Sequence, residues 1–238
     1  MLIIYKFFNL IYKLKLYSFY ISIYTVFKYL KEYNEIRKYK SNISKGDIVI
    51  DGGANVGFYT ILFSKFVGEF GRVIAFEPDI NNFKILKKRT AHLKNVQVVD
   101  AALSDHSGMI DFFLSNELNV DHQAYDSGEG RPSVRVKSYS LDDFLESVGI
   151  QSINFIKTDL QGYDPIALRG MKNTIMKSAN LKLSCEFWPY GMNNAGIDPA
   201  NWLSTLKELN LQTDFVCNPS KLNNKNYYQS IWLTKSEL

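Results

Sequence analysis

The amino-acid sequence predicts an α/β fold, with a mostly parallel β-sheet covered by helices on both faces and a helical segment added at the N-terminus. From residue 46 onward, short β-branched runs alternate with helical stretches. This alternation is typical of a parallel sheet with crossover helices. The first predicted strand runs directly into a glycine-rich turn, and five predicted strands finish on or beside an acidic residue. In such folds, ligands bind at the carboxyl ends of the strands.

The predicted strands and helices follow one another in a regular order. Strands are expected at residues 47–51, 72–77, 96–100, 155–159 and 181–187, with further candidates at 213–217 and 230–234. Helices are expected at residues 55–66, 79–92, 141–148 and 198–209. Asp79 is a good N-cap for the second helix, and Pro199 suits the first turn of the last one. Residues 109–114 and 133–138 alternate like a hairpin, joined by the long polar loop 115–132.

Length and charge divide the chain into two parts. A chain of 238 residues suggests one domain with an appendage, and we expect a segment at 1–45 and a domain at 46–238. The formal net charge is +4, but residues 1–40 alone carry +6 and the remaining 198 residues carry −2. The domain therefore lacks the basic surface of a nucleic-acid-binding protein. Two cysteines are too few for a disulfide framework, which favours a cytoplasmic location.

The N-terminal segment is apolar and aromatic, with polar residues at helical spacing. Positions 18, 22, 25, 28, 32 and 35 recur in steps of three and four, which predicts a polar helix face. The longest uncharged run, 16–27, is shorter than the roughly 20 residues of a membrane span and lacks a signal-peptide cleavage site. One interpretation is a helical layer packed on the domain or on the second subunit of a homodimer. The other is peripheral contact between residues 1–40 and the inner face of a membrane, and a single-pass anchor is least favoured.

The turn after the first strand has the form of a loop that binds a nucleoside cofactor. Residues 51–57 read Asp-Gly-Gly-Ala-Asn-Val-Gly, so a strand passes through a glycine turn into a helix N-terminus. Glycine allows positive φ and close approach of a ligand, and the helix N-terminus offers free N–H groups. Glu77 follows Gly57 by 20 residues, where an acidic side chain can hold ribose hydroxyls. The loop lacks GxGxxG and GxxxxGK[ST], and its DxGxxxG form favours S-adenosylmethionine.

Five ordered motifs between residues 46 and 211 carry a family resemblance. The segments are 51–60 with 75–78, 101–105 with Gly108, 140–144, 156–164 with 168–170, and 186–189. Together they resemble the FkbM family of S-adenosylmethionine-dependent methyltransferases. The resemblance implies a Rossmann-like class I methyltransferase fold, whose seven-stranded sheet has an antiparallel last strand. It also implies methylation of a hydroxyl on a sugar, a glycan such as a polysaccharide precursor, or a similar small metabolite.

The resemblance and the strand ends together give an expected set of cofactor-binding residues. These are Asp51, Gly53, Asn55, Gly57, Glu77, Asp100, Ala101 and Asp159. We expect the backbone of the glycine loop to face the methionyl part, with Asp51 and Asn55 nearby. Glu77 is expected to accept hydrogen bonds from the ribose, and Asp100 and Ala101 to flank the adenine.

Three residues are candidates for the base that removes the proton of the acceptor hydroxyl: Asp159, Glu186 and His122. Asp159 and Glu186 end neighbouring predicted strands, and such a pair could hold a base at raised pKa or a divalent metal. The plainer alternative gives one carboxylate to the cofactor amino group and the other to a helix cap. His122 lies in the long loop that could cover the acceptor. No metal-ligand spacing is present among the histidines and cysteines, so we expect no metal centre.

Other functions remain open on the sequence alone. An NAD(P)-dependent oxidoreductase would share the fold, although the missing GxGxxG argues against it. A binding module that has lost its chemistry is a second alternative, because Gln161 stands where many FkbM members have a glutamate. A nucleic-acid methyltransferase is disfavoured by the slightly acidic domain and by the lack of an Asn-Pro-Pro-Tyr-like motif after the fourth strand.

Overall fold

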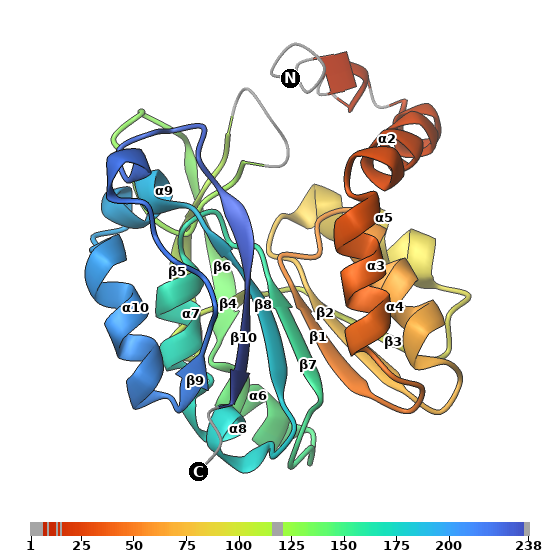
Figure 1. Cartoon of the computed structure of the whole chain (residues 1–238). Coiled ribbons are helices and arrows are strands. Elements are labelled where there is room, and N and C mark those ends of the chain that lie inside the picture. The colour runs from red at the N-terminus through yellow and green to blue at the C-terminus, as the bar shows by residue number, and fades with distance from the viewer. Residues whose placement is uncertain (1–6, 9, 13, 15, 116–120, 236–238) are drawn as a thin grey trace.

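A computed structural model describes residues 7–8, 10–12, 14, 16–115 and 121–235. Its centre is a seven-stranded sheet in the order β3-β2-β1-β7-β8-β10-β9, shown edge to edge in Figure 1. The parallel strands are β1 (Ile48–Gly52), β2 (Arg72–Phe76), β3 (Val96–Val99), β7 (Phe155–Thr158) and β8 (Lys182–Phe187). The α/β fold predicted from the sequence is therefore confirmed.

The last strand of the sheet is antiparallel, as expected. Strand β10 (Gln229–Lys235) pairs antiparallel with β8 and with the two-residue strand β9 (Leu211–Gln212). The strand predicted at 213–217 is wrong, because the chain pairs with β10 only at residues 211–212 and then leaves the sheet. Gln212 is exposed and the side chains of 213–217 are exposed or half-buried, so this edge gains little from further pairing.

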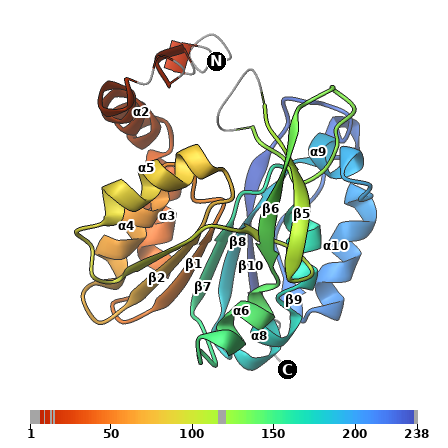
Figure 2. The same ribbon diagram turned by 180° about the vertical axis from the view of Figure 1, so that it is seen from behind.

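Helices cover both faces of the sheet. On one face, α3 (Tyr33–Asn42) and α4 (Phe58–Val67) pack against β1, β2 and β7 through Tyr39, Phe63 and Phe155. The other face packs against α6 (Leu141–Ser147), α7 (Asp164–Arg169), α8 (Lys172–Lys177), α9 (Pro189–Asn194) and α10 (Pro199–Glu208). Because both faces of the central strands are buried, their sequences read as continuous apolar runs. Figure 2 shows the molecule from behind, turned by 180° from the view of Figure 1.

Two helix starts agree with the sequence. The Asp79 carboxylate accepts N–H hydrogen bonds from Asn81 and Asn82 at the start of α5 (Ile80–Thr90). Asp198 accepts from the N–H of Ala200 at the start of α10. These caps satisfy donors that have no partner within the helix.

The predicted hairpin belongs to a second, smaller sheet. Strands β5 (Gly108–Phe113) and β6 (Ser133–Tyr139) pair antiparallel, and β4 (Ala102–Leu103) adds to β6. The segment between β5 and β6 returns along the hairpin, where Phe113 and Gln123 form an isolated bridge. This sheet places the described part of loop 115–132 beside the carboxyl ends of the main strands (Figure 2).

The N-terminal segment forms helices, and several of its predicted polar positions are half-buried: Thr25, Lys28, Glu32 and Glu35. Helix α2 (Tyr17–Lys31) leads into α3. The hydroxyl of Tyr39, a buried residue of α3, forms a hydrogen bond of 3.0 Å with the Ser184 hydroxyl of β8. Tyr20 and Tyr24 of α2 are buried in a cluster with Val56 and Ile85. Val26 and Leu30 are 61% and 74% exposed. The segment is therefore packed on the domain while presenting apolar side chains outward.

Candidate functional site

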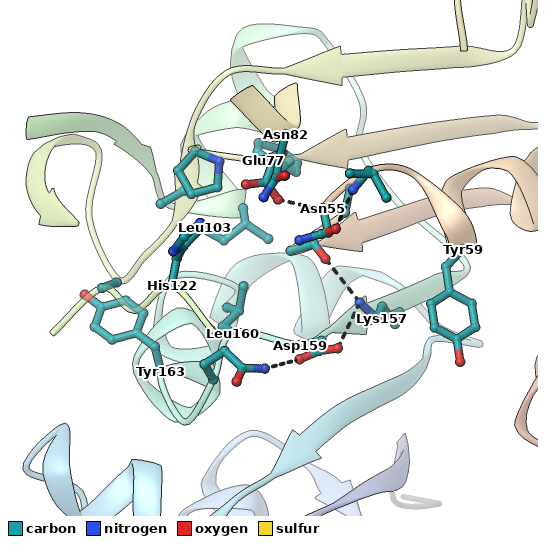
Figure 3. Close-up of a pocket in the computed structure, with 18 of the residues that line it drawn as sticks. Asn55, Tyr59, Glu77, Asn82, Leu103, His122, Lys157, Asp159, Leu160 and Tyr163 are labelled. Atoms are coloured by element: carbon teal, nitrogen blue, oxygen red, sulfur yellow. Dashed lines mark hydrogen bonds and ion pairs between the residues drawn. The ribbon is translucent and has the colours of Figure 1, made fainter. Parts of the chain in front are cut away.

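A pocket opens at the carboxyl ends of β1, β2 and β7, where ligands bind in folds of this architecture. It encloses about 860 Å³ of space, counting the part open to solvent. Figure 3 shows side chains from the glycine turn, from both neighbouring strand ends and from the β5–β6 connection converging on it. The pocket is therefore assembled from segments that lie far apart in the sequence.

The glycine turn has the backbone geometry that its sequence predicts. Gly53 has φ of +73°, and a Cβ at this position would lie 2.2 Å from the carbonyl oxygen of Asp159. The N–H groups of Gly53 and Ala54 both donate to the carbonyl of Phe76, at 3.1 and 2.9 Å. Asn55 also has positive φ and caps the N–H of Val56 with its side chain. Only glycine fits at residue 53, because the backbone of the turn packs directly against the residue that follows β7.

Glu77 is buried at the carboxyl end of β2. Its two carboxylate oxygens accept N–H hydrogen bonds from Asn55 at 2.7 Å and from Asp79 at 2.9 Å. Burial raises the pKa of Glu77 to about 8, although these two N–H groups oppose the shift. Each carboxylate oxygen has a further lone pair, and the side chain lines the pocket. Glu77 can therefore accept hydrogen bonds from hydroxyl groups of a ligand.

A buried lysine joins the ends of β1 and β7. The Lys157 ammonium lies 3.6 Å from an Asp51 carboxylate oxygen and 3.8 Å from one of Asp159. It also lies within 3.5 Å of the carbonyl oxygens of Gly52 and Gly53. Asp51 itself is fully buried beneath the pocket and accepts a hydrogen bond from the Thr60 hydroxyl at 2.6 Å. Lys157 thus neutralises the carboxylates that these strand ends bring together.

Asp159 and Glu186 are linked through Gln161. The Gln161 amide donates to Asp159 at 2.9 Å and to Glu186 at 3.4 Å. Burial, with the carboxylates of Asp159 and Asp164, holds the pKa of Glu186 well above its usual range. Asp159 lines the pocket, whereas Glu186 stands behind Gln161. Within the part of the chain that the structure describes, no group of three or more His, Cys, Asp or Glu is placed to hold a metal ion.

His122 also lines the pocket, but its basic nitrogen is engaged. Its Nδ1 accepts the N–H of Ser115 at 2.9 Å, so in the neutral ring the proton sits on Nε2. Burial lowers the pKa of His122, which favours the neutral ring. In this arrangement Nδ1 already accepts a hydrogen bond, so a proton taken up by the ring would have to bind at Nε2.

The structure brings six of the ten expected site residues into the pocket lining, and Asp51, Gly57, Asp100 and Glu186 lie outside it. Gly53, Asn55, Glu77, Ala101 and Asp159 line the pocket with His122. Asp51 lies below it, and Gly57 caps α4 with φ of +83°. Asp100 is exposed and does not line the pocket, because the chain turns after β3 so that residues 101–103 face inward instead.

Several lining residues were missed by the sequence reasoning. They include Tyr24 and Lys28 of α2, Tyr59 of α4 and Lys157 of β7. Lys157 could have been recognised from the sequence, because a lysine inside an apolar strand is expected to be buried and must then have a charged or polar partner. No feature of the sequence indicates Tyr24 and Lys28 as lining residues, because their position at the pocket depends on how α2 packs against the domain.

Comparisons with known proteins agree with this architecture. Residues 51–212 match the family model described as the methyltransferase FkbM domain. The hexuronic acid methyltransferase AglP of Haloferax volcanii is 28% identical over 187 residues, which is 78% of this chain and 72% of that protein. The 2-O-methyltransferase NoeI of Sinorhizobium fredii is 27% identical over 159 residues, 60% of this chain and 65% of that protein.

A solved structure supports the fold. Fibrillarin of Aeropyrum pernix, determined with natively bound S-adenosyl-L-methionine, superposes with a TM-score of 0.51 at 10% identity. The alignment covers 81% of this chain and 68% of fibrillarin. At this identity the similarity concerns the arrangement of the strands and helices.

Proposed function

Since its residues 51–212 match the family model, the chain belongs to the FkbM methyltransferase family, and we propose that its acceptor is a sugar hydroxyl. It is an S-adenosylmethionine-dependent methyltransferase, as the motifs predicted. One relative is named a hexuronic acid methyltransferase and another a 2-O-methyltransferase, and these names support a small-molecule or glycan acceptor with a hydroxyl group. The observation that carries the proposal is the Asp159–Gln161–Glu186 group beside the glycine turn.

The residues present fit the cofactor. The pocket is lined by the Glu77 carboxyl, which can accept hydrogen bonds from hydroxyl groups, by the glycine turn and by the Asp159 carboxylate. We place the ribose hydroxyls against Glu77, the adenine beside residues 101–103 and the methionyl group over the glycine turn. When bound, S-adenosylmethionine supplies a methyl group on a positively charged sulfur.

Asp159 is placed to receive the proton of the acceptor hydroxyl. Its carboxylate lines the pocket, and Gln161 fixes one of its oxygens by donating to it at 2.9 Å. Glu186 positions Gln161 from the other side. A base within hydrogen-bond reach contributes roughly 10²- to 10⁴-fold to such a transfer. The Gln161 amide, which cannot accept this proton as a carboxylate would, acts here as an orienting group.

Calorimetric titration with S-adenosylhomocysteine tests the site. We expect the wild-type chain to bind, and Glu77→Ala to bind about tenfold more weakly, because two ribose hydroxyls would each lose a hydrogen bond that contributes roughly 0.5–1.5 kcal/mol. Asp100→Ala is the matched control, because it removes a carboxylate at the neighbouring strand end that lies outside the pocket. Equal affinities of Glu77→Ala and wild type would contradict the proposed ribose contact.

Helix α2 is proposed to rest on an anionic membrane surface. Among the described residues, nine of the 17 exposed large apolar side chains lie between Phe7 and Tyr33. On α2 itself, Phe19, Val26 and Leu30 form an outward stripe. A neighbouring groove is lined by Tyr17 and Ile21 of α2 and by three basic side chains of α5: Lys84, Lys88 and Arg89. Apolar residues with flanking Lys and Arg are the pattern of an interfacial helix.

No helix in the described residues is long and apolar enough to span a bilayer. The proposed contact is therefore peripheral, and it would bring the enzyme to an acceptor held at a membrane. The same stripe could instead join two copies of the chain, which the experiment below separates.

Sedimentation with anionic vesicles tests this contact. We expect wild-type protein to co-sediment and Val26→Glu/Leu30→Glu to remain in the supernatant. Val216→Glu is the control, because Val216 is 84% exposed far from α2 in the sequence. Point variants are preferable to deletion of residues 1–40, which would remove the core residues Ile36 and Tyr39. Equal sedimentation of all three, or a wild-type dimer that the double variant dissociates without any vesicle binding, would contradict the proposal.

A further inference from the structure

Helix α2 lies outside the matched family domain, yet it contributes a cation to the pocket. The Lys28 ammonium lies 4.9 Å from the centre of the Tyr59 ring and 5.4 Å from that of Phe58. Its side chain is 19% exposed, and Glu32, one turn along the helix, lies 3.8 Å away. Glu32 in turn accepts a hydrogen bond from the Tyr59 hydroxyl. Lys28 is thus held at the pocket by contacts that include the Phe58 and Tyr59 rings and the Glu32 carboxylate.

The strand order gives the position of each part of the cofactor. Strands β3, β2, β1 and β7 lie side by side in that order. With adenine beside the end of β3 and ribose at Glu77 on β2, the methionyl group extends over β1 and β7. In Figure 3, Asn55 lies between Glu77 and Lys157, and Tyr59 lies beyond Lys157. The methionyl end therefore faces the part of the pocket that Lys28 and Tyr59 line.

A cation would bind the methionyl carboxylate more strongly than a neutral donor, and the lining residues include two lysines, Lys157 and Lys28. Lys157 is enclosed by oxygen atoms of Gly52, Gly53, Asp51 and Asp159 and is 5% exposed. A ligand carboxylate there would have to displace contacts that join β1 to β7. Lys28 has exposed surface, and both ammonium groups lie within 6 Å of the Tyr59 ring centre.

We propose that Lys28 binds the α-carboxylate of the cofactor's methionyl group, so that the N-terminal helix completes the cofactor site. The inference rests on the proposed placement of the cofactor. It also links the two parts of the chain, because α2 carries Lys28 on its inward side and the apolar stripe on its outward side. Ordering of α2 at a surface would then favour cofactor binding.

Binding of two ligands that differ by one carboxylate tests the assignment. The ligands are S-adenosylhomocysteine and its decarboxylated analogue, which keeps the ammonium group. We expect wild-type protein to prefer the first by about tenfold or more, as for a charge-assisted contact. Lys28→Met should lose this preference by binding S-adenosylhomocysteine more weakly while binding the analogue as the wild type does. Lys28→Arg should retain most of it.

Lys31→Met is the matched control, because Lys31 is exposed on the same helix and makes the same change of charge. It should keep the wild-type preference. A Lys28→Met variant that still discriminates between the ligands, or that loses affinity for both equally, would overturn the inference while leaving the cofactor site intact. Failure of wild-type protein to bind either ligand would instead overturn the proposed cofactor placement, and this inference with it.

Discussion

Glu77 is proposed to bind the cofactor, and the burial of its carboxyl group makes the stability of the folded chain depend on pH. It is 5% exposed, and burial raises its pKa from 4.5 to about 8. Buried Asp164, which accepts the N–H of Leu160, has a pKa raised to about 6 by burial. Both groups hold protons in the folded state that the unfolded state has released. The free energy of unfolding should therefore fall as the pH rises from the ordinary pKa of these carboxyl groups to the raised values of about 6 and about 8.

Urea unfolding between pH 4.5 and about 8 measures this linkage. We expect wild-type protein to lose stability as the pH rises toward 8, and Glu77→Gln to lose less, because its amide has no proton to release. The variant loses an acceptor for one of two N–H groups, so its stability should be lower at acidic pH. Equal slopes for the two proteins would show that Glu77 ionises normally.

Asp159 is the residue whose replacement should affect chemistry more than binding. We expect Asp159→Asn to lower the single-turnover rate about 10²- to 10⁴-fold, the contribution of a positioned base. Its affinity for S-adenosylhomocysteine should change far less, because the amide retains an acceptor oxygen. Glu186→Gln should have a smaller effect, since Glu186 acts through Gln161. A variant with full rate at saturating cofactor would remove Asp159 as the base.

At the scale of elements, the turn between β7 and α7 positions the proposed catalytic group. Gln161 and Gly162 have φ of +56° and +88°, and Gln161 is a non-glycine residue in a strained region. The Tyr125 hydroxyl donates to the Gln161 carbonyl at 2.7 Å. A Cβ on Gly162 would lie 2.5 Å from the carbonyl carbon of Gly191 at α9. The backbone of this turn is thus held between two segments.

Gly162→Ala and Gly149→Ala form a matched pair that tests this turn. Both positions have positive φ, but a Cβ at Gly149 would meet no atom within 4 Å. Gly149→Ala should cost only the backbone strain, about 1 kcal/mol, whereas Gly162→Ala should cost at least about 2 kcal/mol more and slow methyl transfer. Thermal and urea unfolding compare the two. Equal losses of stability in the two variants would mean that the backbone of α9 shifts to accommodate the added Cβ without an energetic penalty.

The elements that the sequence predicted correctly are those whose local residue pattern is sufficient to determine them. The central strands were found because burial on both faces leaves apolar runs such as Ile48–Gly52. Helices α7, α8 and α9 were missed, since each has only six residues and two contain a proline in the first turn. The strand at 213–217 was wrong because an edge segment depends on its neighbour rather than on its own pattern.

At the scale of the whole molecule, the pocket combines what the sequence could and could not reveal. Glu77 and Asp159 were predictable, because parallel strands bring their carboxyl ends to one edge. Lys28 and Tyr24 were not, since no spacing relates α2 to residues of β7. The helical spacing of the polar residues of α2 is visible in the sequence, but only the docked helix shows that Lys28 lines the pocket.

The central claim is methyl transfer to a sugar hydroxyl. The most direct measurement incubates the full chain with methyl-labelled S-adenosylmethionine and glycosides of a hexuronic acid and of a neutral hexose. The product is then treated with mild alkali, which cleaves a methyl ester and leaves a methyl ether intact. We predict labelled sugar whose label survives alkali and whose formation depends on Asp159. Alkali-labile label on the uronic acid, or binding of S-adenosylhomocysteine without transfer to either sugar, would contradict the account.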